Sequence, residues 1–271
     1  MNQAEQSQLK AQADDFVRLN AVRFLSKNAR RYSWNSFYGQ AQNGMFCQID
    51  PQPFECKVLA EDESWILVRI GTKSEFKAIY KPLLSVVPDV GSKVLITPYA
   101  RCGFDGIRLD APEPKTNSGN GFTSQVFHIG GKALALPIEK AQNPYLNDLV
   151  GQIQMLPAVD GVRKLVNVLA DVGAVNFQYE DDVYENDGEN QSITPALFWE
   201  VTKSEIFTGR MGIVYDRCAD TYQVVYGEQV AKDLCFDDLP AWFARLLDDG
   251  IWKNIGIQTV SKAPQRLAKA A

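Results

Sequence analysis

Residues 65–80 of the chain read WILVRIGTKSEFKAIY, two apolar runs separated by the four residues GTKS. Both runs are rich in β-branched and aromatic side chains, which favour strands, and a glycine-containing turn between such runs is typical of a β-hairpin. The acidic turn at 61–63 precedes this pair, and the apolar run KVLIT at 93–97 follows it. The spacing predicts a small antiparallel β unit over 54–109, built as a barrel or a sandwich-like unit.

The segment before this unit has the periodicity of an amphipathic helix. Apolar residues recur at steps of three and four from Leu9 to Leu25, which predicts a helix over about 5–29 with one apolar face. Together the helix and the β unit form a predicted first domain at 1–110. The fold class predicted for the whole chain is α+β.

A Pro-, Ser- and Gly-rich stretch at 111–121, APEPKTNSGNG, predicts a linker between two domains. The second domain is expected over 122–265 as an α+β unit with antiparallel hairpins and packed helices, followed by a tail at 266–271. Its predicted hairpins join 122–129 to 132–138 through Gly130-Gly131, and 211–215 to 221–226. Predicted helices end at Gly173 and at Gly250, and 195–207 is compatible with either a short helix or a strand.

The totals describe a globular protein. The chain has 271 residues, of which 45% are hydrophobic and 23% are charged, which is far from a disordered composition. No apolar run approaches the ~18 residues that a membrane span needs, and the polar N-terminal residues lack the apolar core of a secretory signal. We therefore expect a cytoplasmic protein without membrane contact.

Few residues can support bond-making chemistry. The chain has one histidine, His128, and five cysteines at wide spacing without a C-x-x-C pair, which excludes the common zinc and two-histidine sites. His128 lies in a strand-like run, and Cys102 beside Arg101 is the first candidate for a reactive thiol. No phosphate-binding loop or hydrolase motif is present. The sequence predicts no catalytic residue, no metal site and no cofactor.

The basic N-terminal segment is a candidate nucleic-acid surface. No Asp or Glu occurs from residue 16 to residue 49, where basic and aromatic residues concentrate. Cations bind phosphates and exposed aromatic rings stack on unpaired bases. The alternative, which the overall isoelectric point of about 5.1 favours, is an amphipathic helix with core aromatics and a hydrated basic face. The candidates are Arg23, Lys27, Arg30, Arg31, Tyr32 and Trp34.

The acidic stretch at 180–189 is a candidate partner-binding loop. It contains six acids and no basic residue, so it could present carboxylates at spacings that imitate a nucleic-acid backbone and compete for a basic surface on another protein. A loop that serves only solubility is the alternative. The six residues are Glu180, Asp181, Asp182, Glu185, Asp187 and Glu189.

Part of the β unit resembles a known family. The segment FECKVLAEDESWILV at 54–68, then KPLL at 81–84 and VPDVGSKVLI at 87–96, is similar to the KfrB-type small β domain of plasmid and mobile-element proteins. The resemblance covers about a fifth of the chain, and 71–77 departs from the glycine-rich, histidine-containing middle strand of that family. It implies an accessory protein of a mobile element and assigns no catalytic residue.

The sequence therefore predicts a non-enzymatic binding or accessory protein, of plasmid, phage or integrative-element origin, that acts through contacts with another protein. Binding of single-stranded nucleic acid through the basic N-terminal segment is the first alternative. An enzyme with an unfamiliar motif is the second.

Overall fold

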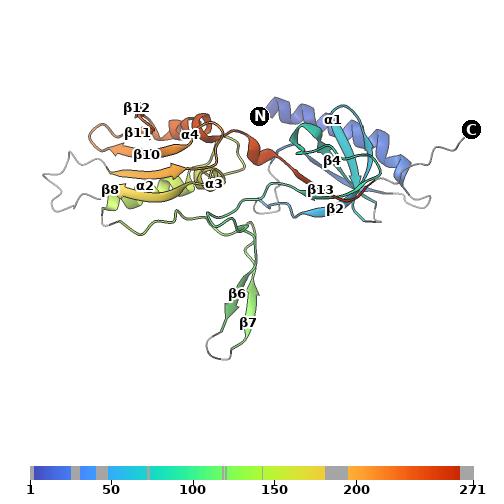
Figure 1. Ribbon diagram of the computed structural model, residues 1–271, viewed down its shortest axis with the longest axis horizontal. Coiled ribbons are helices and arrows are strands. Elements are labelled where there is room, and N and C mark those ends of the chain that lie inside the picture. Colours follow the sequence, from blue (N-terminus) through green and yellow to red (C-terminus); the bar gives the residue numbers. More distant parts are fainter. Residues whose placement is uncertain are drawn as a thin grey trace, which may run out of the picture. The chain divides into compact units, whose positions relative to one another are not determined.

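The computed structural model of the protein describes residues 3–25, 31–40, 48–71, 74–117, 119, 121–141, 143–180 and 195–262. The chain divides into two units (Figure 1). The first unit comprises Met1–Gln42, Pro51–Tyr99 and Trp252–Ala271, and the second comprises Asn43–Asp50 and Ala100–Ile251. The α+β class is confirmed, since each unit combines helices with its own sheet.

The first unit contains a six-stranded sheet in the order β1-β4-β3-β2-β5-β13. Its strands are β1 (Ser33–Phe37), β2 (Phe54–Glu61), β3 (Trp65–Arg69), β4 (Glu75–Tyr80), β5 (Lys93–Thr97) and β13 (Gly256–Ser261). Its helical segments are α1 (Gln3–Ala21) and the 3₁₀ turns η1 (Val22–Phe24) and η2 (Lys81–Leu83), and η4 (Ile251–Lys253) begins at the boundary of the units.

This sheet is open, so the barrel, one of the two alternatives predicted for the β unit, is wrong. Among the described strands, β1 and β13 lie at opposite edges and each pairs with a single neighbour. The sheet is also mixed, because β1 runs parallel to β4 while the other pairs are antiparallel. The parallel pair joins segments that are far apart in sequence, and the local turn signals at 61–63 and 71–74 carry no information about its direction.

Both faces of the sheet carry apolar residues. Helix α1 packs over β1, β3 and β4, and its predicted apolar stripe is confirmed, with Ala13, Phe16 and Val17 buried. The helix ends at Ala21, earlier than predicted, and η1 follows it. The opposite face holds a second cluster built from Val58, Ile66 and other aliphatic side chains.

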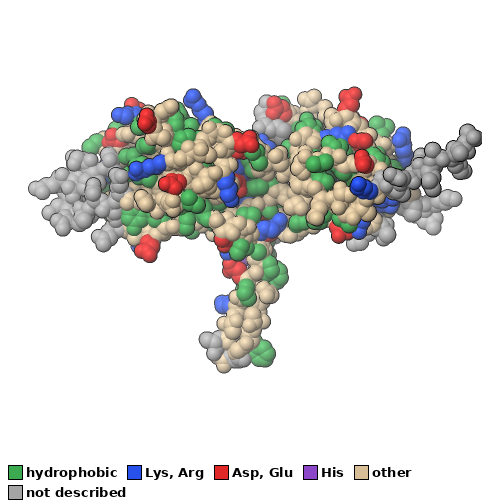
Figure 2. All heavy atoms as spheres, viewed as in Figure 1, with side chains coloured by type: hydrophobic (Ala, Val, Ile, Leu, Met, Phe, Trp, Pro, Cys, Tyr) green, Lys and Arg blue, Asp and Glu red, His purple; other side chains and the backbone are tan. Residues whose placement is uncertain are grey.

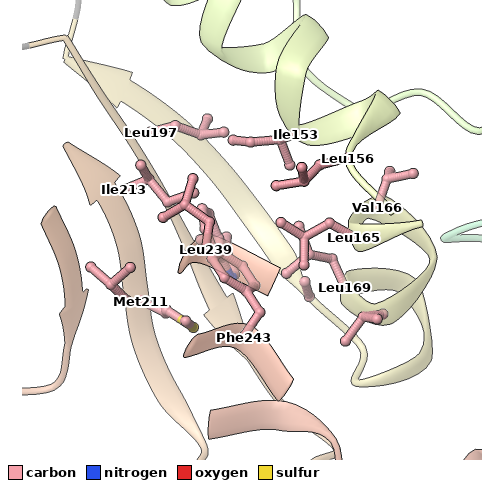
Figure 3. Packing of buried hydrophobic residues seen from close by; sticks show 14 of the residues in the cluster. Ile153, Leu156, Leu165, Val166, Leu169, Leu197, Met211, Ile213, Leu239 and Phe243 are labelled. Atoms are coloured by element: carbon pink, nitrogen blue, oxygen red, sulfur yellow. The ribbon is translucent and has the colours of Figure 1, made fainter. Parts of the chain in front are cut away.

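The second unit is built on a five-stranded antiparallel sheet in the order β12-β11-β10-β9-β8. Its strands are β8 (Val175–Glu180), β9 (Ala196–Val201), β10 (Gly209–Asp216), β11 (Thr221–Tyr226) and β12 (Gln229–Leu234). Its helical segments are α2 (Pro144–Met155), α3 (Leu165–Asp171), η3 (Phe236–Asp238) and α4 (Leu239–Leu247). Leu197 and Ile213 from the sheet meet Ile153 and Leu165 from the helices, with Phe243 of α4 beside them (Figure 3).

Several local predictions for this unit are confirmed. The hairpin of β10 and β11 and the helix α4 form where the periodicity placed them. The segment at 196–201 is a strand, which resolves the alternative left open by the sequence. The side chain of Asp160 accepts hydrogen bonds from the backbone N–H groups of Val162 and Arg163 in the turn before α3.

A two-stranded hairpin occupies part of the stretch predicted as a linker. Strand β6 (Glu113–Thr116) pairs with β7 (Thr123–Val126), and the ribbon extends away from the rest of its unit (Figure 1). The predicted pairing of 122–129 with 132–138 is wrong. The Gly130-Gly131 turn does form, with φ of 82° at both glycines, but the N–H of Lys132 then donates to the carbonyl of Leu109. After the turn, the chain therefore lies beside the segment that contains Leu109.

The units differ from the predicted domains at the C-terminal end as well. Strand β13, expected in the second domain, pairs with β5 in the sheet of the first unit, and the predicted tail at 266–271 lies outside the described residues. None of the helices in the described part of the chain combines the length and the apolar character that crossing a membrane requires.

Candidate functional site: a cationic groove on the first unit

Three basic residues stand side by side across the sheet of the first unit. Lys57 on β2 lies directly opposite Arg69 on β3 and, on its other side, directly opposite Lys93 on β5. Side chains of directly opposed residues in antiparallel strands project from the same face. Like charges in such positions repel one another, so the row costs stability wherever no anion compensates its members.

These residues line a groove of about 460 Å³, which we call the cationic groove. Lys262, next to the end of β13, adds a fourth cation, and Lys57, Lys93 and Lys262 are all exposed to solvent. One acid, Glu55, is among the lining residues, and its carboxylate lies 2.6 Å from the ammonium of Lys93. The remaining lining residues are Cys56, Gly71, Gly91 and Ser261.

Arg69 is the most constrained member of the row. Its Nη1 donates a hydrogen bond of 3.2 Å to the carbonyl of Phe24 in η1, which anchors the guanidinium beside the end of the helical segment. Its Nε is buried and has no hydrogen-bond partner among the described residues. A buried, unpaired donor on a cation is costly, and an anionic ligand near the guanidinium would reduce that cost.

The unit that contains the cationic groove has a positive net charge, whereas the other unit has a negative one. The first unit contains 16 Lys and Arg against 9 Asp and Glu, a net charge of +7. The second contains 12 Lys and Arg against 24 Asp and Glu, a net charge of −12. The whole-chain isoelectric point of about 5.1 is therefore an average over two oppositely charged units. It does not argue against an anion-binding surface on the first.

The predicted nucleic-acid residues are only partly brought together. Arg23 lies in η1, exposed, with its guanidinium 3.5 Å from the side-chain oxygen of Asn20, and Arg31 is exposed before β1. Lys27 and Arg30 lie outside the described residues. A continuous basic ridge on one helix is therefore not present in the described part, because α1 ends at Ala21.

The two predicted aromatics serve the core of the first unit. Tyr32 packs edge-on against Phe76, with ring centroids 5.9 Å apart, and Trp34 lies opposite Phe76 in the sheet. Both pack against the apolar cluster beneath α1 and are half-buried. The alternative reading of these rings as core residues thus agrees with their positions.

Sequence reasoning missed the cationic groove. Consecutive cations of the groove are 12 to 169 positions apart along the chain, and three of the four lie in different strands. The available signal was their position in predicted strands, since Lys57 alternates with the buried Cys56 and Val58, and Lys93 precedes the buried Val94. Only the strand pairing shows that these exposed positions adjoin.

The acidic stretch is almost entirely outside the described residues. Glu180 ends β8, and the other five acids lie outside the described residues: Asp181, Asp182, Glu185, Asp187 and Glu189. The role predicted for this stretch therefore stays a prediction.

The described structure includes both residues that were singled out for chemistry, Cys102 and His128. Burial raises the pKa of Cys102, and nearby Asp171 adds to that effect more than Arg108 opposes it, so the thiol form is favoured. His128 lies 3.5 Å from the carboxylate of Glu113 at the exposed base of the hairpin. In the described part of the chain, no group of three His, Cys, Asp or Glu side chains is placed to hold a metal ion.

Comparison with known proteins adds no relative. No family model, no curated protein and no solved structure matches the chain.

Proposed function

We propose that the protein binds single-stranded nucleic acid through the cationic groove of the first unit. The observation that carries the proposal is the direct opposition of Lys57, Arg69 and Lys93 on three adjacent strands. Glu55 pairs with Lys93, but Lys57 and Arg69 still lie directly opposite each other and repel, and phosphate groups would convert this repulsion into favourable contacts.

The dimensions of the groove suit one nucleic-acid strand. Adjacent strands lie about 4.8 Å apart, so the distance from β13 to β3, across β5 and β2, is about 14 Å. Cations on one such line can follow a single phosphate backbone, and Lys57, Arg69 and Lys93 form one such line across the sheet. Contacts of this kind give affinity without reading the base sequence.

Salt dependence provides the test. Binding of a labelled 20-nucleotide oligonucleotide would be followed by fluorescence anisotropy between 50 and 200 mM salt. Three to four phosphate contacts predict a slope of log affinity against log salt of about −2 to −3, a loss of about 20- to 50-fold over this range. Lys57→Gln should make the slope shallower by about 0.7.

The matched control is Lys10→Gln, which removes the same charge from an exposed position on α1 away from the groove. It should leave the slope unchanged. Absence of binding at 50 mM salt, or equal effects of the two variants, would contradict the proposal. A duplex of the same length should bind more weakly.

A second candidate function is the accessory role through protein contacts. The specific observation is a set of strongly exposed apolar side chains on the β6–β7 hairpin and its base, where Phe122 is 74%, Phe127 70% and Ile129 87% exposed. Hydrophobic side chains lie at the end and along the flank of the hairpin (Figure 2). An isolated two-stranded ribbon is marginally stable, and exposed aromatic rings are typical anchors of protein interfaces.

This candidate predicts a defined cellular partner that co-purifies with the protein. The double variant Phe122→Ser/Phe127→Ser should lose that partner, and undiminished recovery would count against the hairpin. We also propose a cytoplasmic location and a mobile-element origin, and the KfrB-type resemblance supports the latter.

Neutralising the six acids of 180–189 tests whether they contribute to binding of the same partner, with partner recovery as the measurement.

A further inference from the structure

Glu55 is the one acid among the described residues that line the cationic groove. Its carboxylate lies 2.6 Å from the Lys93 ammonium, and both side chains remain about half exposed. A ligand that reaches Lys93 must therefore replace this carboxylate or share the ammonium with it. Because exposed ion pairs contribute little free energy, such a pair can be opened by a competing anion.

We infer that Glu55 is a specificity-determining residue, a resident competitor that restricts the groove to ligands carrying several linked phosphates. The inference rests on the proposed function and concerns the selectivity of the same groove. A single small anion that contacts only Lys93 gains little, because it exchanges one carboxylate for another charge of similar strength and stays beside the displaced Glu55. A chain of phosphates also contacts Lys57 and Arg69, and those contacts support the exchange at Lys93.

The inference has a signature in counterion release. Lys93 is already neutralised by Glu55. When a phosphate replaces the carboxylate, the displaced Glu55 stays beside the nucleic acid, and its negative charge offsets the positive charge of Lys93. The net release of condensed counterions at this position is therefore close to zero. Three cations, Lys57, Arg69 and Lys262, then set the salt slope at about −2.1 for single strands. In the variant Glu55→Gln, Lys93 becomes a full fourth cation and the slope steepens to about −2.8.

The chain contains a matched control on the same strand. Glu61, also on β2, lies 2.6 Å from the ammonium of Lys81 and lines no part of the groove. Glu61→Gln removes the same charge from the same unit, and it also frees a lysine. Any effect of net charge alone should appear equally in both variants.

The experiment compares the full-length protein with Glu55→Gln and Glu61→Gln, using the labelled oligonucleotide of the salt titration. Glu55→Gln should bind about fivefold more tightly at 100 mM salt, with a slope steeper by about 0.7, and inorganic phosphate should displace its oligonucleotide at lower concentration than in the unsubstituted protein. Glu61→Gln should match the unsubstituted protein in slope and in phosphate sensitivity. Circular dichroism would verify that both variants are folded.

The outcomes separate this inference from the proposed function. Unsubstituted protein that binds with a slope near −2.1, together with an unchanged slope in Glu55→Gln, would overturn the role of Glu55 and leave nucleic-acid binding standing. An equal gain in affinity in both variants would show that net charge alone causes the effect, and it would also overturn the role of Glu55. If Glu55→Gln binds while the unsubstituted protein and Glu61→Gln do not, competition by Glu55 is supported and binding by the natural groove is refuted. Absence of binding in all three removes both proposals.

Discussion

Arg163 is the most heavily paired cation in the second unit, and its replacement should destabilise that unit strongly. The side chain is 2% exposed. Its Nε lies 2.9 Å from Asp160, and its Nη1 lies 2.8 Å from Asp171 at the end of α3. Its Nη2 lies 3.2 Å from Asp248, which follows α4. One guanidinium therefore ties the turn before α3 to the ends of two helices.

The expected loss of stability in Arg163→Met depends on the hydrogen bonds and water contacts that the three carboxylates retain. Asp160 is itself buried but retains hydrogen bonds from the backbone N–H groups of residues 162 and 163, at 2.6 and 2.8 Å. Asp171 and Asp248 are 18% and 16% exposed, so water can reach them in part. Removing one partner of a buried ion pair costs about 3–5 kcal/mol, and this partial compensation places the expected loss at about 4 kcal/mol.

Urea unfolding provides the assay, with amide hydrogen exchange of β9 and β10 to assign the transition to the second unit. With a denaturant slope of about 2 kcal/mol/M, a loss of 4 kcal/mol lowers the midpoint by about 2 M. Arg245→Met is the control, since Arg245 is exposed on α4 and contacts the Trp242 ring from 5.1 Å. It should cost at most about 1 kcal/mol. A loss below 1 kcal/mol for Arg163→Met, or equal losses for both variants, would refute this account of the network.

Two further predictions concern a packed glycine and a buried thiol. Gly212→Ala should destabilise the second unit by about 2 kcal/mol in the same urea assay, because a methyl group there would overlap the ring of Phe198, whereas Gly151→Ala in open space on α2 should stabilise it by about 0.5–1 kcal/mol. Similar effects of the two would contradict the packing. Burial raises the pKa of Cys56 to about 12, so iodoacetamide at pH 8 should alkylate exposed Cys218 much faster than Cys56. Mass spectrometry of the labelled peptides measures both rates, and equal labelling of the native protein would show that the thiol is accessible as thiolate.

The amino-acid sequence alone determined the features that depend on neighbours along the chain. The apolar stripe of α1, the β10–β11 hairpin and the helix α4 each arise from periodicity and turn chemistry within a few residues. The α+β class follows from these elements. Local patterns also indicated that Tyr32 and Trp34 could belong to a core, which their packing beneath α1 agrees with.

Tertiary structure alone decided the sheet topology and the candidate site. The parallel pairing of β1 with β4 and the return of β13 to the first sheet join distant segments, and no local signal specifies such partners. The cationic groove depends on the same long-range pairing, because a shift of one residue in register would place Lys57 out of line with Arg69 and Lys93. Charge became informative only after the chain was divided in space, since the +7 of one unit and the −12 of the other nearly offset one another in the sequence total.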